Sequence, residues 1–153
     1  MKKWLLIAVI ALSVALPVVA WVGMLLPGFP AATYLYDSGR LLALVGFVLL
    51  TFQYVLSSKI KWIERGIGLD RMLVSHRTLG KVGAALILAH PFVLSTAELL
   101  LYRRLLLLPL KFVGAAGLAL LVLAAGAALL YPLSNWTYET WKRLHWFNYL
   151  VLP

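Results

Sequence analysis

Long runs of apolar residues, separated by short polar stretches, dominate the pattern of this chain. A helix needs roughly 20 residues to cross the hydrocarbon core of a bilayer. Five segments have the pattern of membrane-spanning helices, although the fifth is incomplete, and they cover about residues 4–26, 40–56, 71–94, 112–131 and 144–153. The sequence therefore predicts an all-α, polytopic membrane helix bundle that forms a single domain over residues 1–153.

Both ends of the chain need a separate interpretation. The first apolar run follows Lys2 and Lys3 and begins like a secretory signal peptide, but it continues without a break to Pro27. We therefore favour a retained helix. The fifth segment offers only about ten residues from Leu144, which are too few to span a bilayer. We expect the C-terminal part of the natural protein to be missing.

Polar stretches at residues 27–39, 57–70, 98–111 and 132–143 separate the predicted helices. The stretch 98–111 is rich in leucine but contains arginines and a proline, so part of it is expected to lie in the membrane interface. The acidic residues are assigned to loops or helix ends: Asp37, Glu64, Asp70, Glu98 and Glu139. A transporter usually places ionisable residues in the bundle core, so this distribution weakens a transport function.

Composition and charge further restrict which kinds of protein and site the sequence is compatible with. The chain is 63% hydrophobic, contains no cysteine and has a formal net charge of +9. The absence of cysteine excludes disulfides, thiol catalysis and cysteine-ligated iron–sulfur clusters. With a cytoplasmic N-terminus, ten of the 14 Lys and Arg residues fall on the cytoplasmic side and four on the outer side. This bias follows the positive-inside rule, so we expect a lipid bilayer and no nucleic acid as partner.

Three histidines are the candidate functional residues: His76, His90 and His145. A histidine within a membrane helix is costly and indicates function by default. His76 and His90 lie 14 residues apart in one predicted helix, which places them on nearly the same face and about 21 Å apart along the axis. One imidazole would lie near each leaflet. Imidazole is a common axial ligand of haem iron, so the spacing is compatible with two stacked haems.

Structural roles remain open for each histidine. His76 and His145 can be solvated residues at helix ends, and His90 can bond a backbone carbonyl that Pro91 frees. Zinc is less favoured, because no helix shows a tight cluster of His, Asp or Glu. On the residues alone, haem ligation and these structural roles both stand.

Two basic residues and several glycines accompany the histidines. Arg77 and Lys81 lie about one turn apart beside His76, where they can hold haem propionates or lipid phosphates. Gly80 and Gly83 leave room for a flat macrocycle or for ordinary helix packing. The fourth segment also permits close helix contact through Gly114, Gly117 and Gly126.

Two strings carry a family resemblance. The first runs from Glu64 to Arg71 and continues with His76 to Gly80 and then His90, and the second covers residues 138–149. Together they resemble the ferric reductase-like transmembrane domain of ferric reductases and NADPH oxidases. The resemblance implies a six-helix bundle with two b haems stacked between helices three and five. In it, His76 and His145 would ligate the inner haem and His90 the outer haem, whose second ligand would lie beyond Pro153.

The resemblance also implies a function. The chain would be the haem-bearing membrane component of an oxidoreductase in a bacterial inner membrane, without a catalytic side chain of its own. Electrons would come from a cytoplasmic flavoprotein with FAD and NAD(P)H on a separate or missing domain. They would leave to ferric iron, oxygen or a periplasmic redox partner at the outer face. The alternatives are a cofactor-free structural or transport protein and a quinol-linked cytochrome b subunit.

Overall fold

The computed structural model describes residues 2–25, 28–58, 60–105 and 108–147. Within these ranges the regular structure is helical, and there is no strand. The chain divides into two compact units, residues 1–105 and 106–153, which are described one at a time.

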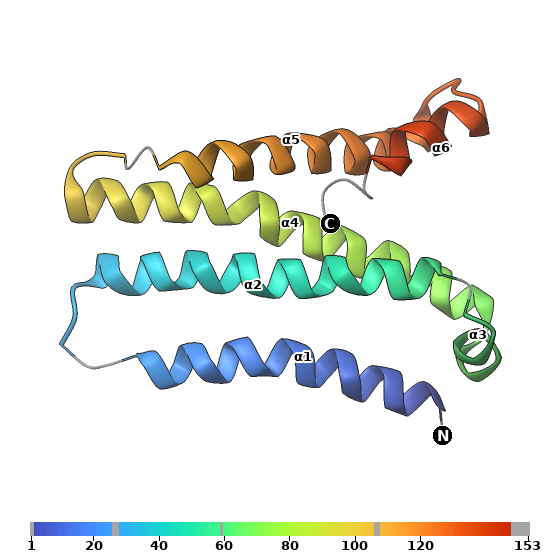
Figure 1. Ribbon diagram of the computed structural model, residues 1–153, viewed down its shortest axis with the longest axis horizontal. Helices are drawn as coiled ribbons and strands as arrows, with labels where there is room; N and C mark the ends of the chain where they lie inside the picture. Colours follow the sequence, from blue (N-terminus) through green and yellow to red (C-terminus); the bar gives the residue numbers. More distant parts are fainter. Residues whose placement is uncertain (1, 26–27, 59, 106–107, 148–153) are drawn as a thin grey trace. The chain divides into compact units, whose positions relative to one another are not determined.

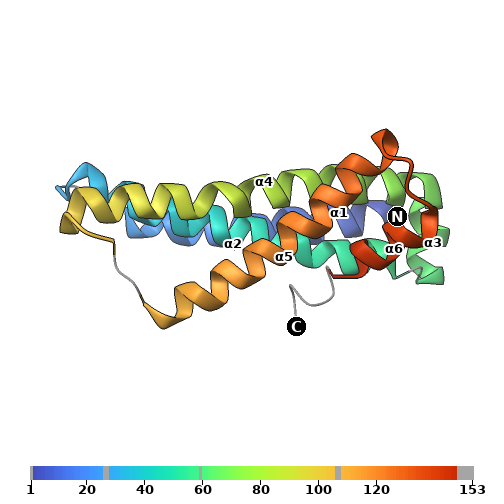
Figure 2. The same cartoon turned by 90° about the horizontal axis from the view of Figure 1, so that it is seen from above.

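The first unit contains α1 (Lys2–Met24), α2 (Ala31–Ser57), α3 (Lys61–Ile67) and α4 (Leu69–Tyr102). Helices α1, α2 and α4 run side by side, with α2 in the middle, and the short α3 lies at the turn between α2 and α4 (Figure 1). Figure 2 shows the long shared contact of α2 and α4 from a second direction. The α2–α4 pair is therefore the centre of this unit.

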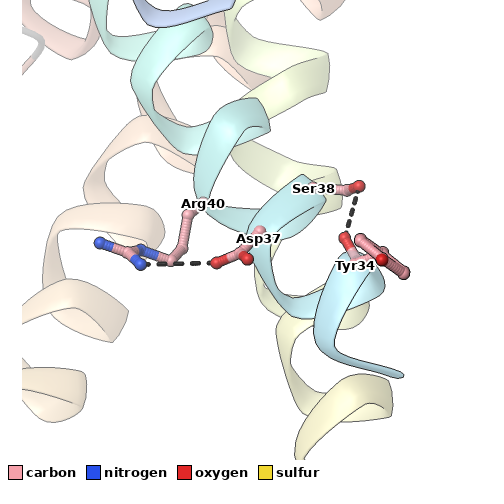
Figure 3. A network of polar contacts seen from close by, with 4 residues as sticks. All are labelled: Tyr34, Asp37, Ser38 and Arg40. Carbon is pink, nitrogen blue, oxygen red and sulfur yellow. Dashed lines mark hydrogen bonds and ion pairs between the residues drawn. The ribbon is translucent and has the colours of Figure 1, made fainter. Parts of the chain in front are cut away.

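Helix α2 begins nine residues earlier than the sequence predicted, at Ala31 instead of Arg40. The prediction treated Asp37 and Gly39 as loop residues, and this was wrong. Inside the helix, Arg40 pairs with Asp37 at 3.5 Å and the Ser38 hydroxyl donates to the Tyr34 carbonyl at 2.7 Å (Figure 3). The polar groups are thus satisfied by neighbours three or four residues away, as a helix allows.

Helix α4 also extends beyond its predicted end near Leu94, to Tyr102. Arg103 ends it in the left-handed conformation with φ 57°, and α5 starts at Pro109, so the described part of residues 98–111 holds no separate interfacial helix.

The assignment of all acids to loops or helix ends needs correction as well. Asp37 lies within α2, whereas Glu98 lies near the C-terminal end of α4, where only 1% of its surface is exposed.

Glycines bring the backbones of α2 and α4 close together. A Cβ atom added to Gly46 would lie 3.1 Å from the carbonyl oxygen of Gly83, and one added to Gly83 would lie 3.2 Å from the carbonyl oxygen of Gly46. Gly39 is similarly filled by Leu94, whose side chain lies 2.9 Å from the Cβ position. Close approach of this kind is how small residues allow membrane helices to pack.

Helix α3 lies in the polar stretch that the sequence assigned to residues 57–70. Its isoleucines recur at helical spacing, and Ile63 is buried at 5% exposure in a small core with Leu56 and Met72. The apolar side of this short helix therefore closes the end of the α2–α4 pair, while Lys61 and Arg65 remain exposed.

The second unit contains α5 (Pro109–Leu130), the single 3₁₀ turn η1 (Tyr131–Leu133) and α6 (Tyr138–Trp146). Thr137 caps α6, because its hydroxyl oxygen accepts the backbone N–H of Thr140 at 3.3 Å. Helix α6 packs against α5. The predicted fifth segment starts within α6, and its residues 148–153 lie outside the described part of the chain.

Three described helical stretches are long and apolar enough to cross a membrane: Ala31–Ser57, Leu69–Tyr102 and Pro109–Leu133. The described apolar part of α1, Ile7–Gly23, is shorter. The prediction of an all-α, polytopic membrane helix bundle is thus confirmed.

Candidate functional site

His76 and His90 both lie on α4, which continues unbroken from Leu69 to Tyr102. Their separation of 14 residues corresponds to about 21 Å along the axis. Both side chains are half-buried. The first unit therefore carries two imidazoles at well-separated levels of one helix.

The ring of His90 has a defined hydrogen bond. Its Nδ1 donates to the backbone carbonyl of Ile87. That carbonyl is four residues before Pro91, which has no N–H to offer it. The structural role that the sequence left open for His90 is therefore present. The same bond leaves Nε2 with its lone pair, and a metal-bound histidine commonly donates its other N–H in this way.

One turn after His76, α4 faces the side-chain amide of Gln53 on α2. A Cβ on Gly80, one turn after His76, would lie 3.2 Å from Oε1 of Gln53. Nε2 of Gln53 donates to the Leu49 carbonyl at 3.2 Å, while the buried Oε1 has no hydrogen-bond partner among the described residues. Sequence reasoning passed over Gln53, although a polar amide within an apolar run was a signal for it.

Arg77 and Lys81 follow His76 on α4, and both side chains are exposed. They lie four residues apart, so they share one side of the helix. Two cations in this arrangement are accessible to an anionic group, and the chemistry suits a carboxylate or a phosphate equally.

His145 lies on α6 in the second unit and is half-buried. Burial lowers the pKa of its imidazole below the ordinary value, and a hydrogen bond to the backbone of Ala124 partly opposes this shift. Desolvation disfavours the charged ring, so the neutral form dominates near pH 7. Neutral imidazole is the form that ligates metals.

An aromatic cluster lies against one face of the His145 ring. Trp141 stacks on its ring, with centroids 5.1 Å apart and an interplanar angle of 14°. Tyr131 and Tyr138 contact Trp141 at 5.3 and 5.5 Å in tilted arrangements. A tryptophan near the end of a membrane helix often belongs to the interfacial belt. Trp141 instead packs within its unit, a role that its four-residue spacing from His145 signalled.

The structure keeps the three histidines on separate turns. His76 and His90 belong to the first unit and His145 to the second. Among the described residues, no three His, Asp or Glu side chains gather as a metal cluster would require. The His90 ring is oriented by its hydrogen bond to Ile87, and the His145 ring is stacked on Trp141.

The chain matches a model of a known protein family. A family model described as "Ferric reductase like transmembrane component" matches residues 42–153. The match covers most of the chain and includes all three histidines. No curated protein and no solved structure matches the chain.

Proposed function

We propose, because this chain belongs to the ferric reductase-like transmembrane component family, that it carries electrons across a bilayer on b-type haem. His76 and His145 would ligate the inner haem, and His90 would supply one ligand of the outer haem. The observation that carries the proposal is the family match, which includes His76, the hydrogen-bonded His90 and the stacked His145.

The side chains present fit haem. His90 donates one ring nitrogen to Ile87 and keeps the other available, and burial favours the neutral form of His145. Gly80 presents no side chain one turn from His76, where only the Gln53 amide lies within 4 Å of a Cβ position among the described residues.

Bound haem would supply one-electron chemistry, and the protein would supply orientation and electrostatics. His76 and His145 would both hold the inner haem, which would leave no place on it for a substrate. Arg77 and Lys81 would pair with the propionates of the inner haem, because both are exposed on the side of α4 next to His76.

The charge bias of the sequence supports the proposed orientation of the chain in the membrane. Ten of 14 basic residues fall on the side of the N-terminus, which we assign to the cytoplasm of a bacterial cell. The donor would be a flavoprotein domain or subunit that carries FAD and NAD(P)H. The acceptor would be ferric iron, oxygen or a redox partner at the outer face, and the chain would act as the membrane part of an oxidoreductase.

One observation favours a second candidate, a cofactor-free membrane protein. The bond between His90 and Ile87 gives this histidine a structural role that needs no metal. In that case the imidazole would donate the hydrogen bond that the Ile87 carbonyl lacks because of Pro91. Removing the imidazole would then affect only the stability of α4.

Optical spectroscopy separates the two candidates. The full-length gene product, produced with excess haem and purified in mild detergent, is expected to show two b haems per chain in a reduced-minus-oxidised spectrum and a pyridine assay. His76→Ala and His145→Ala should each remove the inner haem signal, and His90→Ala should leave it. Thr78→Ala, an exposed change on the same helix, is the matched control. A colourless protein would contradict the haem proposal.

A further inference from the structure

Helix α6 holds the ring of His145 from one face. Trp141 precedes His145 by four residues, so both side chains project from the same side of the helix. Their rings lie nearly parallel, at 14°, with centroids 5.1 Å apart. Both residues belong to one nine-residue helix.

Trp141 is itself held in place by two other rings. Tyr138 comes from the preceding turn of α6, and Tyr131 comes from η1. Both are tilted against the indole, at 36° and 40°, a common geometry for aromatic pairs. The two tyrosines therefore restrain the indole in its position against the imidazole.

A second contact restrains the edge of the His145 ring. Its hydrogen bond to the backbone of Ala124 connects α6 to α5. A ring whose face is stacked and whose edge is hydrogen-bonded has little freedom about either side-chain torsion. Groups that orient an imidazole in this way set its plane and its basicity when it binds a metal.

We propose that Trp141 is a positioning residue: its stacked indole fixes the plane of the His145 imidazole and so stabilises axial ligation of the inner haem. The inference rests on the proposed function, because it takes His145 as an axial ligand. Axial-ligand geometry and the groups behind the ligand tune both haem retention and reduction potential.

An interfacial role does not account for Trp141. A tryptophan of the membrane interface turns its N–H to water or headgroups. Here Nε1 of Trp141 is buried and has no hydrogen-bond partner among the described residues. Trp146, also on α6, is 61% exposed and suits the interfacial role. The two tryptophans thus form a matched pair for an experiment.

The test uses Trp141→Leu, Trp141→Phe and the control Trp146→Leu in the full-length protein. Haem loss to excess apomyoglobin measures retention, and electron paramagnetic resonance of the oxidised haem reports the orientation of the ligand planes. Trp141→Leu should release the inner haem about tenfold faster and shift its low-spin signal. Trp141→Phe keeps an aromatic face and should restore both properties. Trp146→Leu should leave both unchanged.

Three outcomes overturn the inference. Trp141→Leu can behave like the unaltered protein, Trp146→Leu can cause the same loss, or Trp141→Phe can fail as Leu does, which would show that an aromatic face alone does not fulfil the role. If circular dichroism shows that Trp141→Leu does not fold, Tyr131→Leu serves as a second variant, because it removes one ring that contacts Trp141. It should give the same changes in weaker form, and an unchanged signal there overturns the inference too. Retention of the inner haem by His145→Ala would instead contradict the proposed function.

Discussion

The α2–α4 pair and helix α5 are both apolar and contain glycine, yet they use it differently. Gly46 and Gly83 lie against each other's backbone carbonyl, with no room for a side chain. On α5, a Cβ at Gly114, Gly117 or Gly126 would meet no described atom of its own unit within 4 Å. Glycine in an apolar helix is therefore a weak sign of close packing. A facing pair of glycines on two helices is a much stronger one.

The difference matters for the candidate ligands. His76 and His90 lie on the helix whose position is fixed by close backbone contact. His145 lies on a short helix in which aromatic rings provide the support. The candidate ligands thus lie in two kinds of packing: glycines allow close contact of the backbones around α4, and large aromatic side chains support α6.

The largest effect is expected from filling the glycine contact. In Gly83→Val the Cβ alone meets the Gly46 carbonyl, Leu49 and Leu50 at 3.2 Å, and two methyl groups are added. Overpacking of this kind costs about 1–3 kcal/mol. Unfolding in mixed detergent micelles, followed by circular dichroism, measures the loss. Equal loss from Gly114→Val on α5 would remove the contrast between the two regions.

A somewhat smaller loss is expected from Glu98→Ala. Glu98 is 1% exposed near the end of α4 and has a polar partner. Leaving that partner unsatisfied costs about 1–2 kcal/mol, whereas Glu98→Gln, which keeps the size and one acceptor, should cost less. The same unfolding assay ranks the two variants. If Glu98→Ala unfolds like the unaltered protein, the buried carboxyl contributes nothing to the first unit.

A small gain is expected from Gly114→Ala. The position is exposed within α5 and has open space around it in its own unit, as far as the described residues extend. Alanine favours the helix over glycine by up to about 1 kcal/mol. The matched change Gly46→Ala should destabilise instead. Destabilisation by Gly114→Ala would show that α5 has a close neighbour at this position.

The smallest effect is expected from Asp37→Asn. The pair with Arg40 spans 3.5 Å, and the arginine side chain is 64% exposed. Such a pair within a helix contributes at most about 0.5 kcal/mol. Thermal unfolding at low and high salt tests this expectation. A large, salt-sensitive loss would mean that the charge of Asp37 does more than support its own helix.

Sequence reasoning predicted the apolar helices because hydropathy over about 20 residues reflects the bilayer directly. It missed the start of α2, because Asp37 and Gly39 considered alone are typical of a turn. In the structure Asp37 pairs with Arg40 of the same helix. Gly39 packs against Leu94 of α4, a contact that only the tertiary structure reveals. Sequence reasoning correctly placed His76 and His90 on one helix, because both lie in the same long apolar segment. The stack of Trp141 on His145 was readable from spacing, but the hydrogen bond to Ala124 needs the turn between α5 and α6.

The proline after His90 has a consequence for how the protein is assembled. Pro91 leaves the Ile87 carbonyl without its helical donor, and the His90 ring takes that place. The imidazole is consequently oriented by its own helix as soon as the helix forms, before any partner arrives. On the proposed function, the outer ligand is pre-organised during biogenesis, so cofactor insertion loses less side-chain entropy than it would with a freely rotating histidine.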